Sequence, residues 1–360
     1  MAFWPIVIVK MREKLENILE KVYLKPEQAD IAYLLSLDDS RQQEEIFVFA
    51  DKVRKKFVGD GILLRGIIEF SNHCRNSCFY CGLNKNNRKL QRYRLTQEEI
   101  LRSVKFLAEQ KIKTVVLQSG EEDGLDSFWL AEVISRIKRE FDLAITLCVG
   151  ERPQDDYKLW KNSGADRYLL KIETTNEKLY TSLHPQMSFA NRLKCLKGLC
   201  DLGFQVGSGN IIGLKNQTLA DIAQDIIFFK SQDLDMIGIG PFIPHSQTEL
   251  SGHGHGDVGL TLRTLALTRI VCRNAHIPAT TALASLNKDY RLQGLRAGAN
   301  VLMPNFTPMD YKELYEIYPG KKCLTEFADT CVSCMAQKAT AINRYIDYSR
   351  GDALEKKVEV

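Results

Sequence analysis

The sequence predicts an α/β fold, a TIM-type (βα)8 barrel with an N-terminal helical arm and a C-terminal extension. Strand-like apolar runs alternate with helical patterns eight times along the chain, as they do when crossover helices join parallel strands. The 360 residues, 44% of them hydrophobic, also suffice for one core of barrel size. We expect the arm over residues 1–60, the barrel over 61–310 and the extension over 311–360.

The expected strands are short and apolar, and each precedes a helical pattern. They cover Ile62–Glu69, Thr114–Gln118, Ala144–Val149, Tyr168–Ile172, Gln205–Ile212, Met236–Phe242, Ala279–Leu283 and Val301–Pro304. Because a barrel of this kind carries its chemistry in the loops after its strands, polar residues at those ends are candidate functional groups.

Capping residues mark where some of the helices begin. Thr96, with Glu99 three residues later, forms a capping box that predicts a helix start. Two more helices are expected to begin near Asp126 and Thr218.

The N-terminal run Ala2–Val9 is apolar but too short to span a bilayer. It lacks a basic flank and a small-residue cleavage site, and the amphipathic helical pattern Met11–Tyr23 follows it. We therefore expect no membrane segment, and we take Met11 as the natural start.

Charge and cysteine usage narrow the class of protein. Lys and Arg number 49 against 45 Asp and Glu, and a net charge of +4 does not indicate a nucleic-acid partner. The ten cysteines are sparse over a long chain and partly clustered at the spacing of metal ligands. The cysteine usage favours a cytoplasmic protein with reduced, metal-binding thiols.

The strongest chemical signal follows the first expected strand. Cys74, Cys78 and Cys81 place three thiols within eight residues. A structural zinc site requires four closed ligands, whereas three cysteines around a 4Fe-4S cluster leave one iron open to another ligand. A zinc knuckle is the alternative, but no fourth cysteine is near, and His73 is poorly placed to close the same site.

This Cys-x3-Cys-x2-Cys motif, with the aromatic Tyr80 before its last cysteine, resembles the signature of radical S-adenosyl-L-methionine (SAM) enzymes. The resemblance implies a 4Fe-4S cluster whose open iron binds SAM, and reductive cleavage of SAM to a 5'-deoxyadenosyl radical. An oxygen-sensitive cluster of this kind suggests an anaerobic host.

Further segments resemble the SAM-binding elements of that family. The resemblance implies that Gln118, Gly120 and Glu121 after the second strand approach the methionyl ammonium, and that Ile239 lies in the adenine platform. It further implies that Glu173 holds the ammonium or ribose and Arg192 the carboxylate, since arginine offers a bidentate fork. A helix-surface ion pair is the alternative for Arg192. Asn210, beside Gly207 and Gly209, resembles the ribose-binding strand.

Longer segments resemble the HydE family of iron-iron hydrogenase maturases. They include Ile68–Asn72, Val116–Glu121, Gly164–Leu170, Gly238–His245, Ile277–Thr281 and Gly298–Asn305. The resemblance implies a role in building the hydrogenase active-site cluster from an iron-cysteine species bearing carbon monoxide and cyanide. It also implies the partner maturases HydG and HydF and an electron donor such as ferredoxin or flavodoxin. One departure is Lys215-Asn216, where the family often has Pro-Gly.

A second cysteine group, Cys323, Cys331 and Cys334, resembles the accessory 2Fe-2S or 4Fe-4S site of some HydE proteins. We expect it to be dispensable for catalysis, and a redox Cys-x2-Cys pair is the alternative. The other cysteines in apolar patterns, Cys148, Cys195, Cys200 and Cys272, are interpreted as core residues. The stretch Gly252–Gly256, with His253 and His255, is interpreted as a glycine loop rather than a metal site.

Four residues near strand ends are candidates to line a substrate cavity: Lys171, Thr280, Thr281 and Met303. Alternation along a strand would point Thr280 and Thr281 in opposite directions.

Two other functions remain open from the sequence. One is a different radical SAM enzyme, 3-methylornithine synthase or biotin synthase. Biotin synthase needs further barrel cysteines, and Cys148 alone lies on an expected strand. The other is a non-catalytic iron-sulfur scaffold, which would bind a cluster without cleaving SAM.

Overall fold

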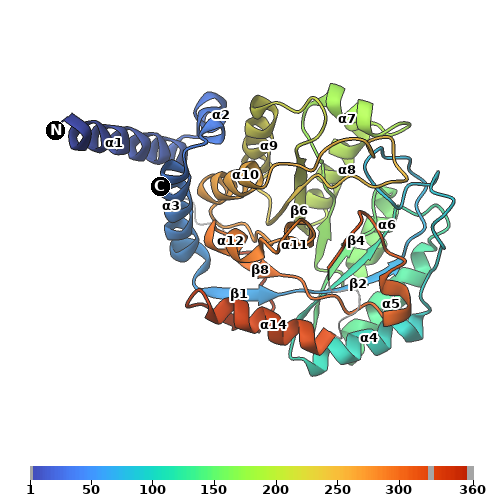
Figure 1. Ribbon diagram of the computed structural model, residues 1–360. Coiled ribbons are helices and arrows are strands. Elements are labelled where there is room, and N and C mark those ends of the chain that lie inside the picture. The colour runs from blue at the N-terminus through green and yellow to red at the C-terminus, as the bar shows by residue number, and fades with distance from the viewer. Residues whose placement is uncertain (1–2, 323–327, 355–360) are drawn as a thin grey trace.

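In the computed structural model, which describes residues 3–322 and 328–354, parallel strands form a barrel surrounded by helices (Figure 1). The strands are β1 (Gly61–Leu64), β2 (Gly66–Ser71), β3 (Thr114–Ser119), β4 (Ala144–Cys148), β5 (Arg167–Leu169), β6 (Gln205–Ile212), β7 (Met236–Pro241), β8 (Val301–Leu302) and β9 (Tyr345–Asp347). The helices are α1 (Phe3–Leu24), α2 (Gln28–Ser36), α3 (Ser40–Val58), α4 (Gln97–Glu109), α5 (Ser127–Glu140), α6 (Gln154–Asn162), α7 (Glu177–Leu183), α8 (Phe189–Asp201), α9 (Leu219–Ser231), α10 (Val258–Val271), α11 (Thr281–Ala284), α12 (Arg291–Arg296), α13 (Met309–Lys312) and α14 (Ala328–Thr340).

Two parallel sheets make up the barrel wall. One has the order β2-β3-β4-β5-β6-β7 and the other β8-β1-β9. Parallel bridges join them: Ile67 pairs with Asn305, Met236 with His276 and Pro278 with Val301. These bridges close the ring of strands, so the predicted TIM-type barrel is confirmed.

The first expected strand is divided in two at Arg65. The segment before it, β1, pairs with β8 and β9, and the segment after it, β2, pairs with β3. Since β9 lies beyond residue 340, the C-terminal extension supplies a strand beside the first strand of the barrel.

The strand predicted at Ala279–Leu283 is wrong. Backbone hydrogen bonds hold the extended segment 276–279 against β7 and β8, while α11 begins at Thr281. Pro278 has no N–H to donate, so this position in the ring is filled by isolated bridges.

The predicted helix starts are confirmed. Thr96 and Glu99 form the capping box of α4, the Asp126 carboxylate accepts from backbone N–H groups of α5, and Thr218 begins α9 with a second capping box.

The N-terminal arm consists of α1, α2 and α3, and α1 projects away from the barrel (Figure 1). It starts earlier than the pattern predicted, since its helical backbone begins at Phe3. Among the described residues, no helix combines the length and apolarity needed to cross a membrane.

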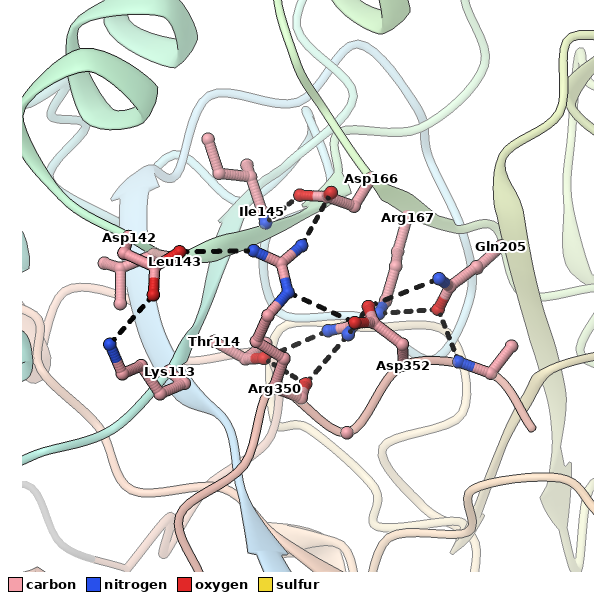
Figure 2. Close-up of polar contacts among 12 residues, drawn as sticks. Lys113, Thr114, Asp142, Leu143, Ile145, Asp166, Arg167, Gln205, Arg350 and Asp352 are labelled. Atoms are coloured by element: carbon pink, nitrogen blue, oxygen red, sulfur yellow. Dashed lines mark hydrogen bonds and ion pairs between the residues drawn. The ribbon is translucent and has the colours of Figure 1, made fainter.

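The segment 350–353 covers the amino-terminal end of the barrel, called the base below (Figure 2). Thr114, Arg167 and Gln205 each begin a strand there. The buried Arg167 guanidinium donates to Thr114 Oγ1, Gln205 Oε1, the Arg350 carbonyl oxygen and Asp352 Oδ1, at 2.6–3.0 Å. The opposite end, called the mouth, is where the loops after the strands gather.

Candidate active site

The loop after β2 carries the three motif cysteines, and the Arg92 guanidinium joins its two ends. Arg92 donates to the carbonyl oxygens of Asn72, Leu83 and Asn84, at 2.6, 2.9 and 2.7 Å. These carbonyls lie on both sides of the motif, and hydrogen bonds from a charged donor are among the stronger ones in proteins. The protein therefore fixes the course of the cysteine loop with its own groups.

Gly120, directly after β3, lies against this loop. A Cβ at this position would come within 2.3 Å of the His73 carbonyl oxygen and 2.8 Å of the Cys74 Cβ. Only glycine allows so close an approach, and the Gly120 N–H donates to the Ser71 carbonyl oxygen at 3.2 Å. The end of β3 is thus fixed beside Cys74.

The three motif thiols are buried enough to resist ionisation. Burial raises the pKa of Cys74, raises that of Cys78 well above its usual range and raises that of Cys81 to about 12. Because thiolates are the ligands that bind iron, a bound metal has to displace these protons. Within the described residues, no three His, Cys, Asp or Glu side chains surround the position of a single ion. The three thiols instead line one cavity, where they would hold a multi-iron cluster.

That cavity, of about 380 Å³, lies at the mouth of the barrel. It brings together most of the residues that the sequence singled out, from six separate segments. Those that line it are Cys74, Cys78, Tyr80, Cys81, Gln118, Glu121, Lys171, Glu173, Arg192, Thr280, Thr281 and Met303.

Glu173 has an unusual backbone. Its φ is 63°, in the left-handed region that few residues other than glycine adopt. The expected strand through Ile172 stops short at Leu169, because the Ile172 N–H donates to the Ser208 hydroxyl instead of a carbonyl. The Glu173 carboxylate forms an ion pair with Lys171 at 2.8 Å. A strained acid on a cavity wall is a typical feature of a ligand site.

Arg192, on the first turn of α8, is buried and lines the cavity, so the alternative of a surface ion pair is wrong. Its Nε donates to Glu151 at 2.6 Å and its Nη1 to the Lys171 carbonyl oxygen at 2.8 Å. Asn191 donates to the other oxygen of Glu151. These contacts hold a fixed positive charge at the cavity wall.

The half-buried Tyr80 and the buried His184 form another part of the wall. The Tyr80 hydroxyl lies 2.8 Å from His184 Nε2, and His184 Nδ1 lies 2.7 Å from the Tyr180 carbonyl oxygen. The carbonyl can only accept, so Nδ1 carries the proton and Nε2 accepts from Tyr80. Burial lowers the pKa of His184 to about 4, which keeps the imidazole neutral at pH 7.

Comparison with known proteins identifies the family. The radical SAM superfamily model matches residues 68–229, a span that includes the three cysteines, Glu173 and Arg192. The [FeFe] hydrogenase maturase subunit HydE of Thermotoga maritima is 46% identical over 313 residues, which cover 86% of this chain and 89% of that protein. The chain belongs to the HydE family. It is therefore a radical SAM enzyme, with a 4Fe-4S cluster and SAM as cofactors.

More distant relatives have the same barrel. The 3-methylornithine synthase of Methanosarcina acetivorans is 29% identical, covering 82% of this HydE-family chain and 83% of that protein. The crystal structure of methylornithine synthase (PylB) superposes with a TM-score of 0.80 at 24% identity, covering 92% of this chain and 97% of that one. The crystal structure of the maturase HydG superposes with a TM-score of 0.79 at 19% identity, covering 94% and 76%. These structural likenesses show the fold.

Three of the predicted cofactor contacts do not line the cavity of this HydE-family chain. Gly120 lies behind Cys74, as described above. Ile239 is fully buried, while its neighbours Gly238 and Gly240 face the cavity. Asn210 donates to Asp225 on α9 at 2.9 Å, so its side chain points out of the barrel. For Asn210 and Ile239 the reason is strand alternation, which a resemblance between motifs does not resolve.

Thr280 and Thr281 both line the cavity, contrary to the expectation that they point in opposite directions. The chain passes from an extended segment into α11 between them, so strand alternation does not apply. The Thr280 hydroxyl donates to the Ile239 carbonyl oxygen at 3.1 Å.

Several cavity residues were missed by the sequence reasoning. Lys321 forms a buried ion pair with Glu69, and Asn305 donates to the other Glu69 oxygen at 3.0 Å. Cys148 lines the cavity and is not a core residue, because it ends β4 at the mouth. Cys200 is exposed on α8, so the prediction that it is a core residue is also wrong. Glu69 is a polar residue at the end of an expected strand, so the sequence could have identified it as a candidate cavity residue. Lys321 is 252 residues away from Glu69 in the chain, and nothing local in the sequence indicates that the two meet.

The second cysteine group is described only in part, because Cys323 lies outside the described residues. Cys331 is buried and Cys334 is half-buried, both on α14. His253 and His255 lie in the loop before α10, as expected for Gly252–Gly256.

Proposed function

We propose that this HydE-family chain uses SAM cleavage to assemble the iron-iron hydrogenase active-site cluster, with an iron-cysteine species bearing carbon monoxide and cyanide as substrate. The observation that supports it is that three thiols, the Glu173 carboxylate and the Arg192 guanidinium line the same cavity at the mouth of the barrel. The 46% identity to HydE over most of both chains supports the maturation role.

In this proposal Cys74, Cys78 and Cys81 hold the 4Fe-4S cluster. When bound and reduced, the cluster supplies the electron that cleaves the SAM sulfonium. Arg92 keeps the loop in shape around it, and Gly120 keeps the end of β3 close to Cys74. The protein itself positions the cluster and SAM and excludes water from the cavity.

The charged cavity residues are proposed to orient SAM. Arg192 binds the carboxylate and Glu173 the ammonium or ribose, since each has a sign opposite to its ligand group. Gln118 and Tyr80 line the same space. Glu121 accepts from Arg75 at 2.8 Å and from the Glu151 N–H at 2.8 Å, so we assign it to supporting the loops around the cofactor. Gly120, Asn210 and Ile239 would act through their backbone or their neighbours.

The remainder of the cavity is proposed to receive the substrate. Lys171, Thr280, Thr281 and Met303 offer a cation, hydroxyls and an apolar surface there. Apolar side chains such as Phe242 exclude water, which a radical reaction requires.

We propose the partners HydG and HydF, a ferredoxin or flavodoxin as reductant, and a location in the cytoplasm. The accessory cluster at Cys323, Cys331 and Cys334 is proposed as dispensable. The division into arm (1–60), barrel (61–310) and extension (311–360) is kept as a proposal.

The first experiment is anaerobic reconstitution with iron and sulfide, then dithionite and SAM, with quantitation of 5'-deoxyadenosine. Cys78→Ser should abolish the product. Cys272→Ser, which changes a buried cysteine directly after α10, should retain it. If wild type forms a cluster but no 5'-deoxyadenosine, the chain is a scaffold and the proposal is wrong.

The second experiment tests the maturation role. The reconstituted protein is added to HydG, HydF and hydrogenase lacking its active-site cluster, and hydrogen production is measured. Activation that requires both this chain and SAM supports the role. If lysine is converted to 3-methylornithine instead, the methylornithine synthase alternative holds.

A further inference from the structure

We infer that Asp225, which lies outside the cavity, is a positioning residue that holds Glu173 for the cofactor through Thr175 and Asn210. The inference rests on the proposed contact between Glu173 and SAM. It concerns the outer surface of the barrel wall, between β6 and α9.

Glu173 needs support because of its backbone. With φ at 63°, it is in a conformation that a side chain with a Cβ disfavours, and such conformations persist only where surrounding contacts enforce them. Two contacts come from β6: the Glu173 N–H donates to the Gly209 carbonyl oxygen at 2.9 Å, and its carbonyl accepts from the Ile211 N–H at 3.2 Å. They fix one side of the bend only.

Asp225 fixes the other side. Its Oδ1 accepts from both the N–H and the hydroxyl of Thr175, each at 2.6 Å. Its Oδ2 accepts from the Asn210 amide at 2.9 Å. Thr175 is two residues after Glu173, and Asn210 is the bridge partner of Glu173 on β6. One carboxylate therefore ties the bend to the strand beside it.

Asp225 is a buried carboxylate on α9 without a cationic partner in the part of the chain that the structure describes, which is an unfavourable environment for a charged group. Its side chain is fully buried, and no ion pair found among the described residues includes it. Burial raises its pKa to about 6, although the bonds from Thr175 and Asn210 act to lower it. Asn210 Oδ1 is also buried without a hydrogen-bond partner. Unfavourable burial of this kind is retained where a neighbouring group must be held precisely.

The test compares Asp225→Ala and Asp225→Asn with wild type. In cluster-free protein, hydrogen exchange of the Thr175 amide reports the bend itself. In reconstituted protein, equilibrium dialysis gives the Kd for SAM, and 5'-deoxyadenosine formation gives KM and kcat. We expect Asp225→Ala to speed exchange at Thr175 and to raise Kd and KM about 10- to 100-fold, with kcat within about threefold.

Asp225→Asn should retain most of the affinity. One oxygen can still accept from Thr175, and the Asn210 amide can rotate to present its free Oδ1 to the new amide. Thr175→Val, which loses only the hydroxyl contact, should raise Kd about 3- to 10-fold and remains informative if Asp225→Ala fails to fold.

Asp166→Ala is the matched control. Its carboxylate also accepts from a backbone N–H, that of Ile145 at 2.7 Å, but at the base. It should weaken the fold and leave the Kd for SAM unchanged. Faster exchange in Asp225→Ala with an unchanged Kd would overturn the inference, as would unchanged exchange, or an equal rise in Kd for Asp166→Ala. If wild type itself neither binds SAM nor forms 5'-deoxyadenosine, the proposed function fails, and the positioning role for the cofactor fails with it.

Discussion

Two buried arginines at opposite ends of the barrel, Arg167 and Arg192, have similar surroundings and different uses. At the base, all three Arg167 nitrogens donate to protein groups, and the C-terminal segment supplies the Asp352 partner (Figure 2). At the mouth, Arg192 is held by Glu151 and lines a cavity together with three thiols. A buried charge whose partners all come from the chain stabilises the fold, whereas one that faces a cavity is available to a ligand.

The mouth and the base also differ in how each uses a buried histidine. His184, at the mouth, accepts from the Tyr80 hydroxyl and faces the cavity. His276, at the base, lies 3.0 Å from the Asp352 carbonyl oxygen and 3.0 Å from the Asn300 amide. Variants at the mouth should therefore lower activity more than stability, and variants at the base should do the reverse.

The largest effect is expected for Glu173→Gln at the mouth. Without its charge the proposed contact with SAM is lost, and kcat/KM for 5'-deoxyadenosine formation should fall about 100-fold or more. The free energy of unfolding of cluster-free protein should change by less than about 1 kcal/mol, because Lys171, the partner in the ion pair, is 28% exposed and can be solvated without Glu173. A fall in stability that matches the fall in activity would contradict the comparison.

The next effect is expected for Asp352→Ala at the base. Arg167 is fully buried and would lose its carboxylate, but Asp352 is 43% exposed, so we expect a loss of about 1–3 kcal/mol in urea unfolding. The kinetic constants for SAM should stay within twofold. Lys113→Ala, which removes a surface pair with Asp142 at the same end, is the control and should change stability by less than about 0.5 kcal/mol.

A smaller effect concerns pH. Burial lowers the pKa of His276 to about 3 and that of His184 to about 4, below the unfolded value of about 6.5. As the pH falls below 6.5, the unfolded chain takes up protons that the folded chain does not. Each histidine should therefore reduce the free energy of unfolding by about 1.4 kcal/mol per pH unit until its folded pKa is reached.

His276→Gln tests how much the histidine at the base of the barrel contributes to the pH dependence of the free energy of unfolding. Urea unfolding of cluster-free protein between pH 7 and 4.5 should give a slope shallower than that of wild type by about 1.4 kcal/mol per unit. An unchanged slope would show that His276 is not held neutral.

The smallest effect is expected for Tyr80→Phe. It removes the donor to His184 Nε2, but both side chains line the cavity, where water can replace that donor, so stability should fall by less than about 0.5 kcal/mol and 5'-deoxyadenosine formation about three- to fivefold. Tyr311→Phe, which removes a hydroxyl contact to Glu99 outside the cavity, should have almost no effect on either quantity. Equal losses in the two variants would show that the position of the Tyr80 contact in the cavity adds nothing.

Periodicity predicted the barrel well, because parallel strands buried on both faces read as continuous apolar runs. It failed at Ala279–Leu283, where three-dimensional contacts make a bridge and α11 from a run that looks like a strand. The direction of side chains was the least predictable feature. Asn210 and Ile239 point away from the cavity and Cys148 into it, although all three lie on predicted strands.

The sequence by itself determined the barrel and the cysteine motif, since both depend on residues close together in the chain. Tertiary structure alone decided which groups meet at the mouth: Lys321 with Glu69, Glu151 with Arg192, and Asp225 with the bend at Glu173. It also decided that the C-terminal segment covers the base. The physical reason is that local spacing fixes a helix, a strand or a metal loop, whereas ion pairs and buried hydrogen bonds join segments whose separation in the chain carries no signal of their contact.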